Sequence, residues 1–148
     1  MRAALAAEGR RAGEIGVVLA ADAELRALNR RWRGIDRATD VLSFEYGERD
    51  GRRVSGDLVI SMDRVGEQAR RFRVTEGREL ARLAVHGALH LAGLDHARPG
   101  ERRHMRLRED RALRAAAAAV RALERALARG RGRQQGVVSA SLSRATQT

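Results

Sequence analysis

Three of the four histidines in the chain lie within the eleven-residue stretch HGALHLAGLDH, from His86 to His96. On a helix, His86 and His90 share one face with roughly 5–6 Å between their Cβ atoms, so both can bind one metal ion. Gly93 is a residue type that ends helices, which lets His96 fold back as a third ligand. Three neutral imidazoles suit zinc and leave a fourth coordination position for water. The spacing therefore predicts one catalytic Zn²⁺ per chain.

The residue after the first histidine distinguishes this stretch from the zinc peptidases that share its spacing of histidines and glycine, H-x-x-x-H-x-x-G-x-x-H. Those enzymes place a glutamate there as general base, whereas this chain has Gly87. The expected nucleophile is therefore a zinc-bound hydroxide, whose parent water has a pKa near 7, or a substrate hydroxyl assisted by the metal. Gly87 shares an apolar stripe with Ala84 and Leu91, so we expect it to let the helix pack closely. A metallopeptidase with a non-standard base and a non-catalytic protein with a structural zinc remain alternatives.

Three other residues near the histidine stretch have competing interpretations. Asp95 could orient a histidine as a hydrogen-bonded carboxylate, or it could be a turn residue. His104 lies eight residues after His96 within a predicted helix, and we expect it at the surface. Met105 lies in the same amphipathic helix and is expected in the core.

The chain is strongly basic, with a net charge of +11 and a pI near 11.6, and all its basic residues are arginines. Such a chain is attracted to polyanions, of which nucleic acid is the commonest. Arg114, Arg121 and Arg125 fall on one stripe of the last predicted helix, which forms either a track for RNA phosphates or a solvated face. The aromatic content of 3% argues against a stacking platform.

Composition also limits the class of protein. There are no cysteines, which excludes disulfides and thiolate metal sites. No apolar run approaches the ~18–20 residues of a membrane span, so we expect a cytoplasmic protein with no membrane partner. The length indicates one domain over residues 1–129, and the Gly/Ser/Thr/Gln-rich residues 130–148 are expected to form a disordered tail.

Hydrophobic periodicity predicts an α+β fold. We expect the run from Glu14 to Ala20 to form a buried strand and the run from Gly56 to Met62 to form a central one. Asp22 and Thr75 are the expected helix caps. The remaining predicted elements are a short helix within residues 1–12, a strand at Asp40–Tyr46, and helices at Asp22–Arg33, Asp63–Phe72, Glu76–Ala92 and Glu101–Arg129.

Several blocks of the chain, in order, resemble one family. HGALHLAGLDH resembles the signature of the YbeY family of bacterial metal-dependent endoribonucleases. LNRRWRGIDRATDVLSFEY, residues 28–46, resembles its second block, and GDLVIS, residues 56–61, its third. Glu109 also stands where the family tends to have a glutamate. The resemblance covers about residues 14–127. Trp32 replaces a usual tyrosine and Ala38 a usual proline, and the family's opening strand has no counterpart before the first helix.

This resemblance implies an α+β fold with a small mixed β-sheet packed against helices, a central metal-binding helix and a metzincin-like zinc site. It implies that His86, His90 and His96 bind Zn²⁺, with Arg33 and His86 as catalytic residues. The implied activity is single-strand-specific RNA cleavage in ribosomal RNA maturation at the 3′ end of small-subunit RNA and in ribosome quality control. The implied partners are ribosomal RNA, the small ribosomal subunit and a ribosome-assembly GTPase.

Overall fold

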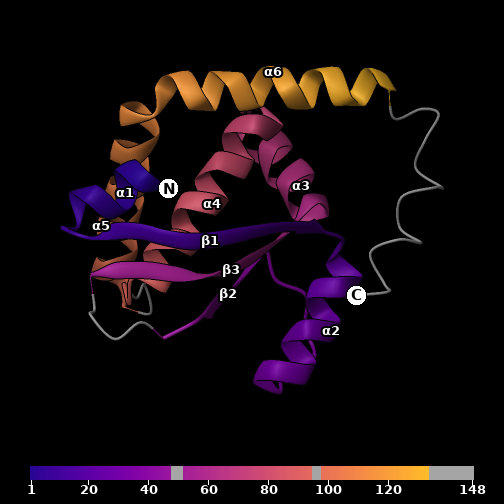
Figure 1. Ribbon diagram of the computed structural model, residues 1–148. Coiled ribbons are helices and arrows are strands. Elements are labelled where there is room, and N and C mark those ends of the chain that lie inside the picture. Colours follow the sequence, from indigo (N-terminus) through magenta and orange to yellow (C-terminus); the bar gives the residue numbers. More distant parts are fainter. Residues whose placement is uncertain (48–51, 95–97, 134–148) are drawn as a thin grey trace.

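A computed structural model describes residues 1–47, 52–94 and 98–133 of the chain (Figure 1). A three-stranded sheet separates one helix on one side from the other helices on the opposite side. In chain order the elements are α1 (Arg2–Ala7), β1 (Arg11–Ala20), α2 (Asp22–Arg33), β2 (Val41–Glu45), β3 (Arg53–Ser61), α3 (Met62–Phe72), α4 (Glu76–Leu91), α5 (Pro99–Ala115) and α6 (Ala117–Arg133).

The sheet is mixed, as the family resemblance implied, with the strand order β1-β3-β2. β3 runs parallel to β1 and antiparallel to β2, so that Leu58 is paired with Val17 on one side and Ser43 on the other. The prediction that β3 is central is confirmed, since Leu58 and Ile60 are fully buried. The mixed α+β class is therefore confirmed.

The prediction that β1 is a buried strand is wrong. β1 pairs only with β3 among the strands that the structure describes, so it lies at the edge of the sheet. Val17, Val18 and Leu19 are 41–52% exposed. A short apolar run occurs in both central and edge strands. Its residues alone do not determine whether one or two strands pair with it.

α4 is the central helix, and it is covered on most sides. It packs against β2, β3, α1, α3, α5 and α6, with Leu83, Ala88 and Leu89 buried. Thr75 caps α4 as predicted, because its side-chain oxygen accepts a hydrogen bond from the backbone N–H of Arg78 at 3.1 Å. The predicted stop is also confirmed, since Gly93 has a φ of +87°, just after the helix ends.

Gly87 is the point of closest approach between α4 and the sheet. A Cβ atom on Gly87 would lie 2.8 Å from Leu58 Cδ2 and 3.3 Å from Val41 Cγ2. Real Cβ atoms essentially never approach another atom within 3.0 Å. The expected role of this glycine, close packing of the central helix, is confirmed.

The expected cap of α2 is replaced by a different interaction. Ala21, not Asp22, is the N-cap residue. Asp22 instead accepts a hydrogen bond of 2.6 Å from the hydroxyl of Ser61, and it also forms an ion pair with Arg64. The Ser61 hydroxyl in turn accepts a hydrogen bond from the backbone N–H of Arg64 and so caps α3. Asp22 therefore joins the start of α2 to the start of α3.

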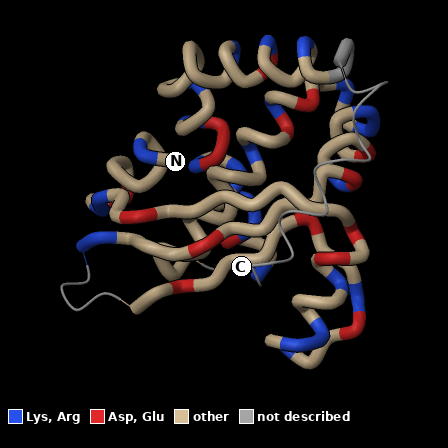
Figure 2. The backbone as a smooth tube through the Cα atoms, turned by 45° about the vertical axis from the view of Figure 1, so that its right-hand side comes forward, with Lys and Arg blue, Asp and Glu red and all other residues tan. Residues whose placement is uncertain are grey.

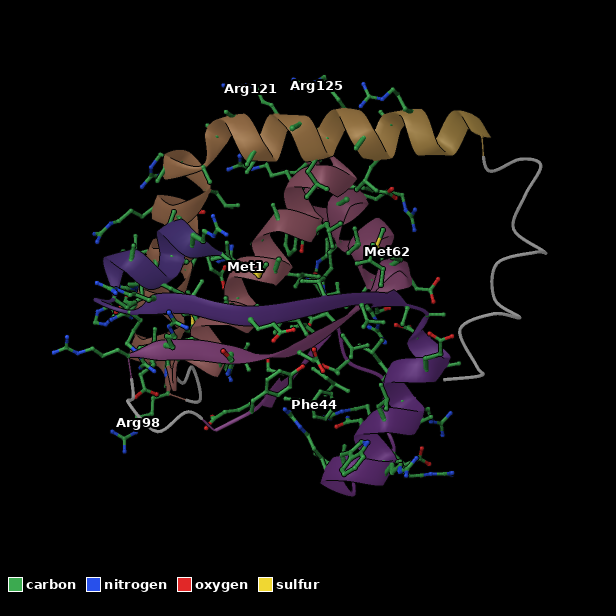
Figure 3. All side chains as sticks on the ribbon, viewed as in Figure 1. Met1, Phe44, Met62, Arg98, Arg121 and Arg125 are labelled. Carbon is green, nitrogen blue, oxygen red and sulfur yellow. The ribbon has the colours of Figure 1, made fainter. Side chains whose placement is uncertain are left out.

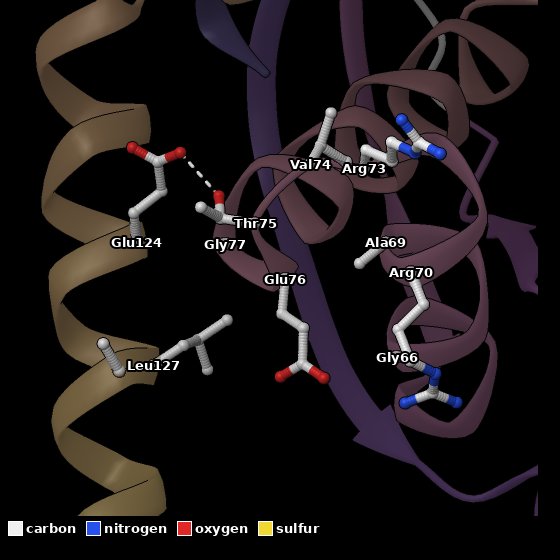
Figure 4. A pocket seen from close by; sticks show the side chains of 11 residues that line it. Gly66, Ala69, Arg70, Arg73, Val74, Thr75, Glu76, Gly77, Glu124 and Leu127 are labelled. Carbon is white, nitrogen blue, oxygen red and sulfur yellow. Dashed lines mark hydrogen bonds between the residues drawn. The ribbon is translucent and has the colours of Figure 1, made fainter.

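The prediction of a single C-terminal helix over Glu101–Arg129 is wrong. The chain forms two helices there, and they meet at Ala116 (φ −104°, ψ 27°). α6 crosses the junction between α3 and α4, where Thr75 donates a hydrogen bond of 2.5 Å to Glu124 (Figure 4). Gly77 faces the backbone of Glu124 and has no room for a Cβ atom. The alanine run at the bend contains no helix breaker, so tertiary packing rather than local sequence sets the bend.

α6 extends past the predicted domain end at Arg129 to Arg133. The rest of the predicted tail, residues 134–148, lies outside the described residues, so its expected disorder remains a prediction. Within the described part of the chain, no helix has both the length and the apolar character needed to cross a membrane.

Candidate metal centre

α4 brings His86 and His90 together on one face. The two Nε2 atoms are 3.1 Å apart, and the ring centroids are 4.7 Å apart. This placement agrees with the four-residue spacing in the sequence. His96, the expected third ligand, and Asp95, the expected orienting carboxylate, both fall within residues 95–97, outside the described residues. Their roles therefore remain predictions.

Glu109 on α5 holds the other nitrogen of the first histidine. One carboxylate oxygen of Glu109 lies 2.5 Å from His86 Nδ1, and the Glu109 side chain is only 4% exposed. A carboxylate that accepts the Nδ1 proton leaves the Nε2 lone pair of neutral His86 directed toward His90. Carboxylates that fix metal-binding histidines act in this way.

The role of Glu109 was not predicted from the sequence, although a usable signal was present. Glu109 lies four residues after Met105 and four before Leu113, and all three are buried on one face of α5. A carboxylate on an apolar helix face needs a buried partner, because desolvation of an unpaired charge is costly. The same data confirm Met105 as a core residue, and His104 is exposed as expected.

Arg82 links this carboxylate to the rest of α4. Its guanidinium lies 3.4 Å from Glu109 and 2.6 Å from Glu79, whose side chain is 2% exposed. Burial alone lowers the pKa of Arg82, but the hydrogen bonds and charges of Glu79 and Glu109 outweigh it and raise the pKa. Arg82 also donates to Gln68 at 3.2 Å. These contacts hold Glu109 in place behind His86.

Arg33 reaches the same region from the opposite face of the sheet. Its Nη2 donates a hydrogen bond of 3.2 Å to the backbone oxygen of Ser43, and the Ser43 hydroxyl donates to the backbone oxygen of Gly87 on α4. A cleft of about 280 Å³ is lined by Arg33, Ser43 and both histidines. The structure thus brings together Arg33, His86 and His90, which the sequence analysis had placed in one site.

Two carboxylates that the sequence analysis left out of the site line this cleft as well. Asp40 comes just before β2, where its side chain accepts a hydrogen bond from Gln68. Glu45 ends β2 and lies on the same strand face as Ser43, because side chains alternate along a strand. The cleft therefore combines two imidazoles and a guanidinium with acidic side chains along its wall.

The three arginines expected along one helix stripe are divided between two helices. Arg114 lies on α5, whereas Arg121 and Arg125 lie on α6. All three are exposed, and Arg121 and Arg125 point away from the domain (Figure 3). The bend at Ala116 therefore removes the single continuous stripe that the prediction assumed. Their role in RNA binding remains a prediction.

The imidazole nitrogens of His86 and His90 suit a metal ion of intermediate softness such as zinc. Two nitrogens 3.1 Å apart can both lie about 2.0–2.1 Å from one zinc ion. Among the residues that the structure describes, no three histidine or acidic side chains converge on one point. The described histidines would thus supply two ligands, and a third must come from elsewhere in the chain or from solvent.

Comparison with known proteins identifies the family. The family model described as endoribonuclease YbeY matches residues 2–117. An endoribonuclease YbeY of Anaeromyxobacter sp. is 50% identical over 106 residues, covering 71% of this chain and 55% of the relative. That of Chloroflexus aurantiacus is 46% identical over 118 residues, covering 73% of this chain and 77% of the relative. The chain thus spans about half the length of the Anaeromyxobacter relative that it matches.

A solved structure shares the fold. The solution structure of the protein TM1509 from Thermotoga maritima superposes with a TM-score of 0.51 and 29% sequence identity. The match covers 78% of each chain. The arrangement of the small mixed sheet and its helices is therefore found in a protein of measured structure.

Proposed function

The chain belongs to the endoribonuclease YbeY family, and we propose that it is a metal-dependent endoribonuclease acting on single-stranded RNA. The observation that carries this proposal is the cleft in which the Nε2 atoms of His86 and His90 converge beside Arg33. A metal-binding pair and a guanidinium in one cleft suit a substrate with a negatively charged reacting group. The net charge of +11 agrees with a polyanionic substrate.

The proposed metal is zinc, with one ion per chain. His86, His90 and His96 would hold it, and Glu109 would fix the orientation and tautomer of His86. When bound, the metal supplies a Lewis acid that polarises the phosphodiester. The remaining work falls to side chains of the chain itself.

Arg33 is proposed to stabilise the negative charge that builds up on the phosphate during cleavage. A guanidinium can donate two parallel hydrogen bonds to phosphate oxygens. Arg33 donates to a carbonyl oxygen of β2 in the cleft wall, so this exposed guanidinium is directed toward the site. Donors fixed in advance stabilise a transition state without the cost of reorganisation.

The packing around Gly87 counts against a peptidase that uses the standard glutamate base. A glutamate at position 87 would stand where Gly87 meets Leu58 and Val41, in the packed interface between α4 and the sheet. The glutamate base of the zinc peptidases therefore has no space in this fold. The cleft instead offers Arg33, which suits a phosphodiester better than a peptide.

The biological substrate follows from family membership rather than from the site. We propose ribosomal RNA, with cleavage near the 3′ end of small-subunit RNA and a role in ribosome quality control. The proposed partners are the small ribosomal subunit and a ribosome-assembly GTPase, and the proposed location is the cytoplasm. These proposals rest on the resemblance of the histidine stretch and its neighbouring blocks to the family.

The test compares metal-loaded and chelator-treated protein on structured ribosomal RNA, with casein as the alternative substrate. We expect cleavage of RNA only with metal, no cleavage of casein, and loss of RNA cleavage in His86→Ala and His90→Ala. The chemistry of the new ends identifies the nucleophile, since attack by the 2′-hydroxyl gives a 2′,3′-cyclic phosphate and attack by water does not. A wild-type protein whose RNA cleavage needs no metal and is unchanged in both histidine variants would contradict the proposal.

A further inference from the structure

The indole of Trp32 is exposed on the last turn of α2, one residue before Arg33. It is 62% exposed, more than any other large hydrophobic side chain in the described part of the chain. A single exposed apolar residue is ordinary on a protein surface and does not by itself indicate a binding site. The surroundings of Trp32 supply the further observations.

Trp32 lies within a cluster of arginines. Arg30, Arg31 and Arg33 occupy the last turn of α2, and the Arg31 guanidinium lies 5.2 Å from the centroid of the indole ring. Figure 2 shows this basic end of α2 projecting from the sheet. An aromatic ring flanked by arginines combines a flat stacking surface with attraction to phosphates.

The end of α2 is held in place by hydrogen bonds. Gly34 has a φ of +67° and closes the helix, with its N–H bonded to the oxygen of Arg30 at 3.1 Å. Asn29 is 5% exposed, and its side-chain amide donates to the backbone oxygen of Arg37 at 2.8 Å. The backbone that carries Trp32 and Arg33 is therefore fixed relative to the cleft.

A single RNA strand offers both groups that this surface could bind. Its phosphates match the guanidinium of Arg33, and its unpaired bases have flat faces that stack on aromatic rings. Trp32 adjoins Arg33, which lines the cleft with both histidines. We propose that Trp32 is a stacking subsite for an unpaired base of the RNA strand whose phosphate lies at Arg33. This inference rests on the proposed endoribonuclease function and adds a reason for single-strand preference, since a base within a duplex is not free to stack on the indole.

The low aromatic content bears on this inference. With 3% aromatic residues, the chain cannot form a platform that stacks a long run of bases. One indole next to Arg33 needs only one base, so the sequence-based argument against a platform does not exclude this subsite. The arginines around the ring favour a polyanion over an uncharged protein partner.

Trp32 is the only tryptophan in the chain, so its fluorescence reports this position alone. The metal-loaded full chain is titrated with a short single-stranded RNA carrying 2′-O-methyl groups, which limit cleavage during the measurement. A second titration uses an oligomer of the same length with abasic sugars in place of nucleotides. We expect the RNA to quench the fluorescence at saturation and the abasic oligomer to leave it nearly unchanged.

Affinities of labelled oligomers then separate stacking from phosphate binding. Trp32→Ala is expected to weaken binding of the base-containing oligomer by about 5- to 150-fold, the range for one stacked base, without altering binding of the abasic oligomer. Trp32→Phe is expected to retain most of the affinity. Ile35→Ala is the matched control, because Ile35 is a 44% exposed apolar residue three positions further on.

Two results would overturn this inference. One is equal affinity of wild type and Trp32→Ala for the base-containing oligomer, and the other is equal quenching by the two oligomers. If metal-dependent RNA cleavage is nevertheless observed, the proposed function stands and only the stacking subsite falls. If base-dependent quenching is observed without any cleavage, the subsite stands and the proposed catalytic function falls.

Discussion

His86 Nδ1 lies 2.5 Å from a carboxylate oxygen of Glu109, although the two residues are 23 positions apart on different helices. This contact fixes which imidazole nitrogen is available in the cleft. It connects the packing of α5 on α4 to the proposed metal chemistry. The buried pair is therefore the part of the core that we expect to affect metal affinity most.

Glu109→Gln is expected to weaken zinc binding by about 10- to 100-fold, as is typical for loss of a carboxylate that orients a metal ligand. The amide keeps the size of the side chain but removes the charge that faces His86 and Arg82. The measurement is a zinc titration in competition with a chelator. Asp110→Asn, on the next residue of α5, is the control and should bind zinc as wild type does. Equal affinities in Glu109→Gln and wild type would contradict this role.

Gly87→Ala is expected to destabilise the fold by about 1–3 kcal/mol, because it overpacks a closed interface. The added Cβ would lie 2.8 Å from Leu58 Cδ2, and Leu58 is fully buried. Urea unfolding gives the change in free energy. Gly100→Ala is the control, since nothing lies within 4 Å of a Cβ at Gly100. A Gly87→Ala protein as stable as wild type would show that α4 can move away from the sheet at little cost.

Ser61→Ala is expected to cost about 1–3 kcal/mol, because it removes the cap of α3 and one of the hydrogen bonds that the Asp22 carboxylate accepts. Ser61 is fully buried, and its hydroxyl lies 2.6 Å from the Asp22 carboxylate. Unfolding of both single variants and the Ser61→Ala/Asp22→Ala double variant forms a cycle. We expect the double variant to lose less stability than the two single variants together. Strict additivity would mean that the two side chains do not interact.

Tyr46 is the only tyrosine, so its ionisation can be followed by ultraviolet absorbance. Its hydrogen bond to Asp57 raises its pKa above the ordinary value of 10. The stabilisation is present below the unfolded-state pKa and is lost as the pH rises through the folded-state pKa. Asp57→Asn should bring the pKa down toward 10. Glu14→Gln should lower it less, because Glu14 acts on Tyr46 only through its charge. A pKa unchanged by Asp57→Asn would show that the Asp57 carboxylate does not act on Tyr46.

Local sequence was enough to predict the parts of the site that lie on one helix. The pairing of His86 with His90 follows from helical spacing, and the limits of α4 follow from Thr75 and Gly93. The packing role of Gly87 was also predictable. Gly87 lies on the apolar stripe of the helix, and it stands where the zinc peptidases have a glutamate. These features depend on residues only a few positions apart.

Contacts between distant segments were not predictable in the same way. The pairing of Glu109 with His86 depends on how α5 packs on α4, which helical periodicity does not specify. The bend at Ala116 lies within an alanine run that favours a continuous helix, and it reflects the packing of α6 over Gly77. The edge position of β1 depends on the number of its neighbours, which its own apolar residues do not encode.

One cleft is proposed to bind a metal and to use Arg33 in the cleavage of RNA. The most direct measurement determines bound zinc per chain and the rate of RNA cleavage for wild type, Arg33→Ala and His90→Ala, with Arg2→Ala as a control for the loss of one exposed arginine. We predict that His90→Ala loses both zinc and cleavage, whereas Arg33→Ala keeps its zinc and loses cleavage. Full cleavage by zinc-loaded Arg33→Ala, or cleavage by wild type freed of metal, would contradict the account.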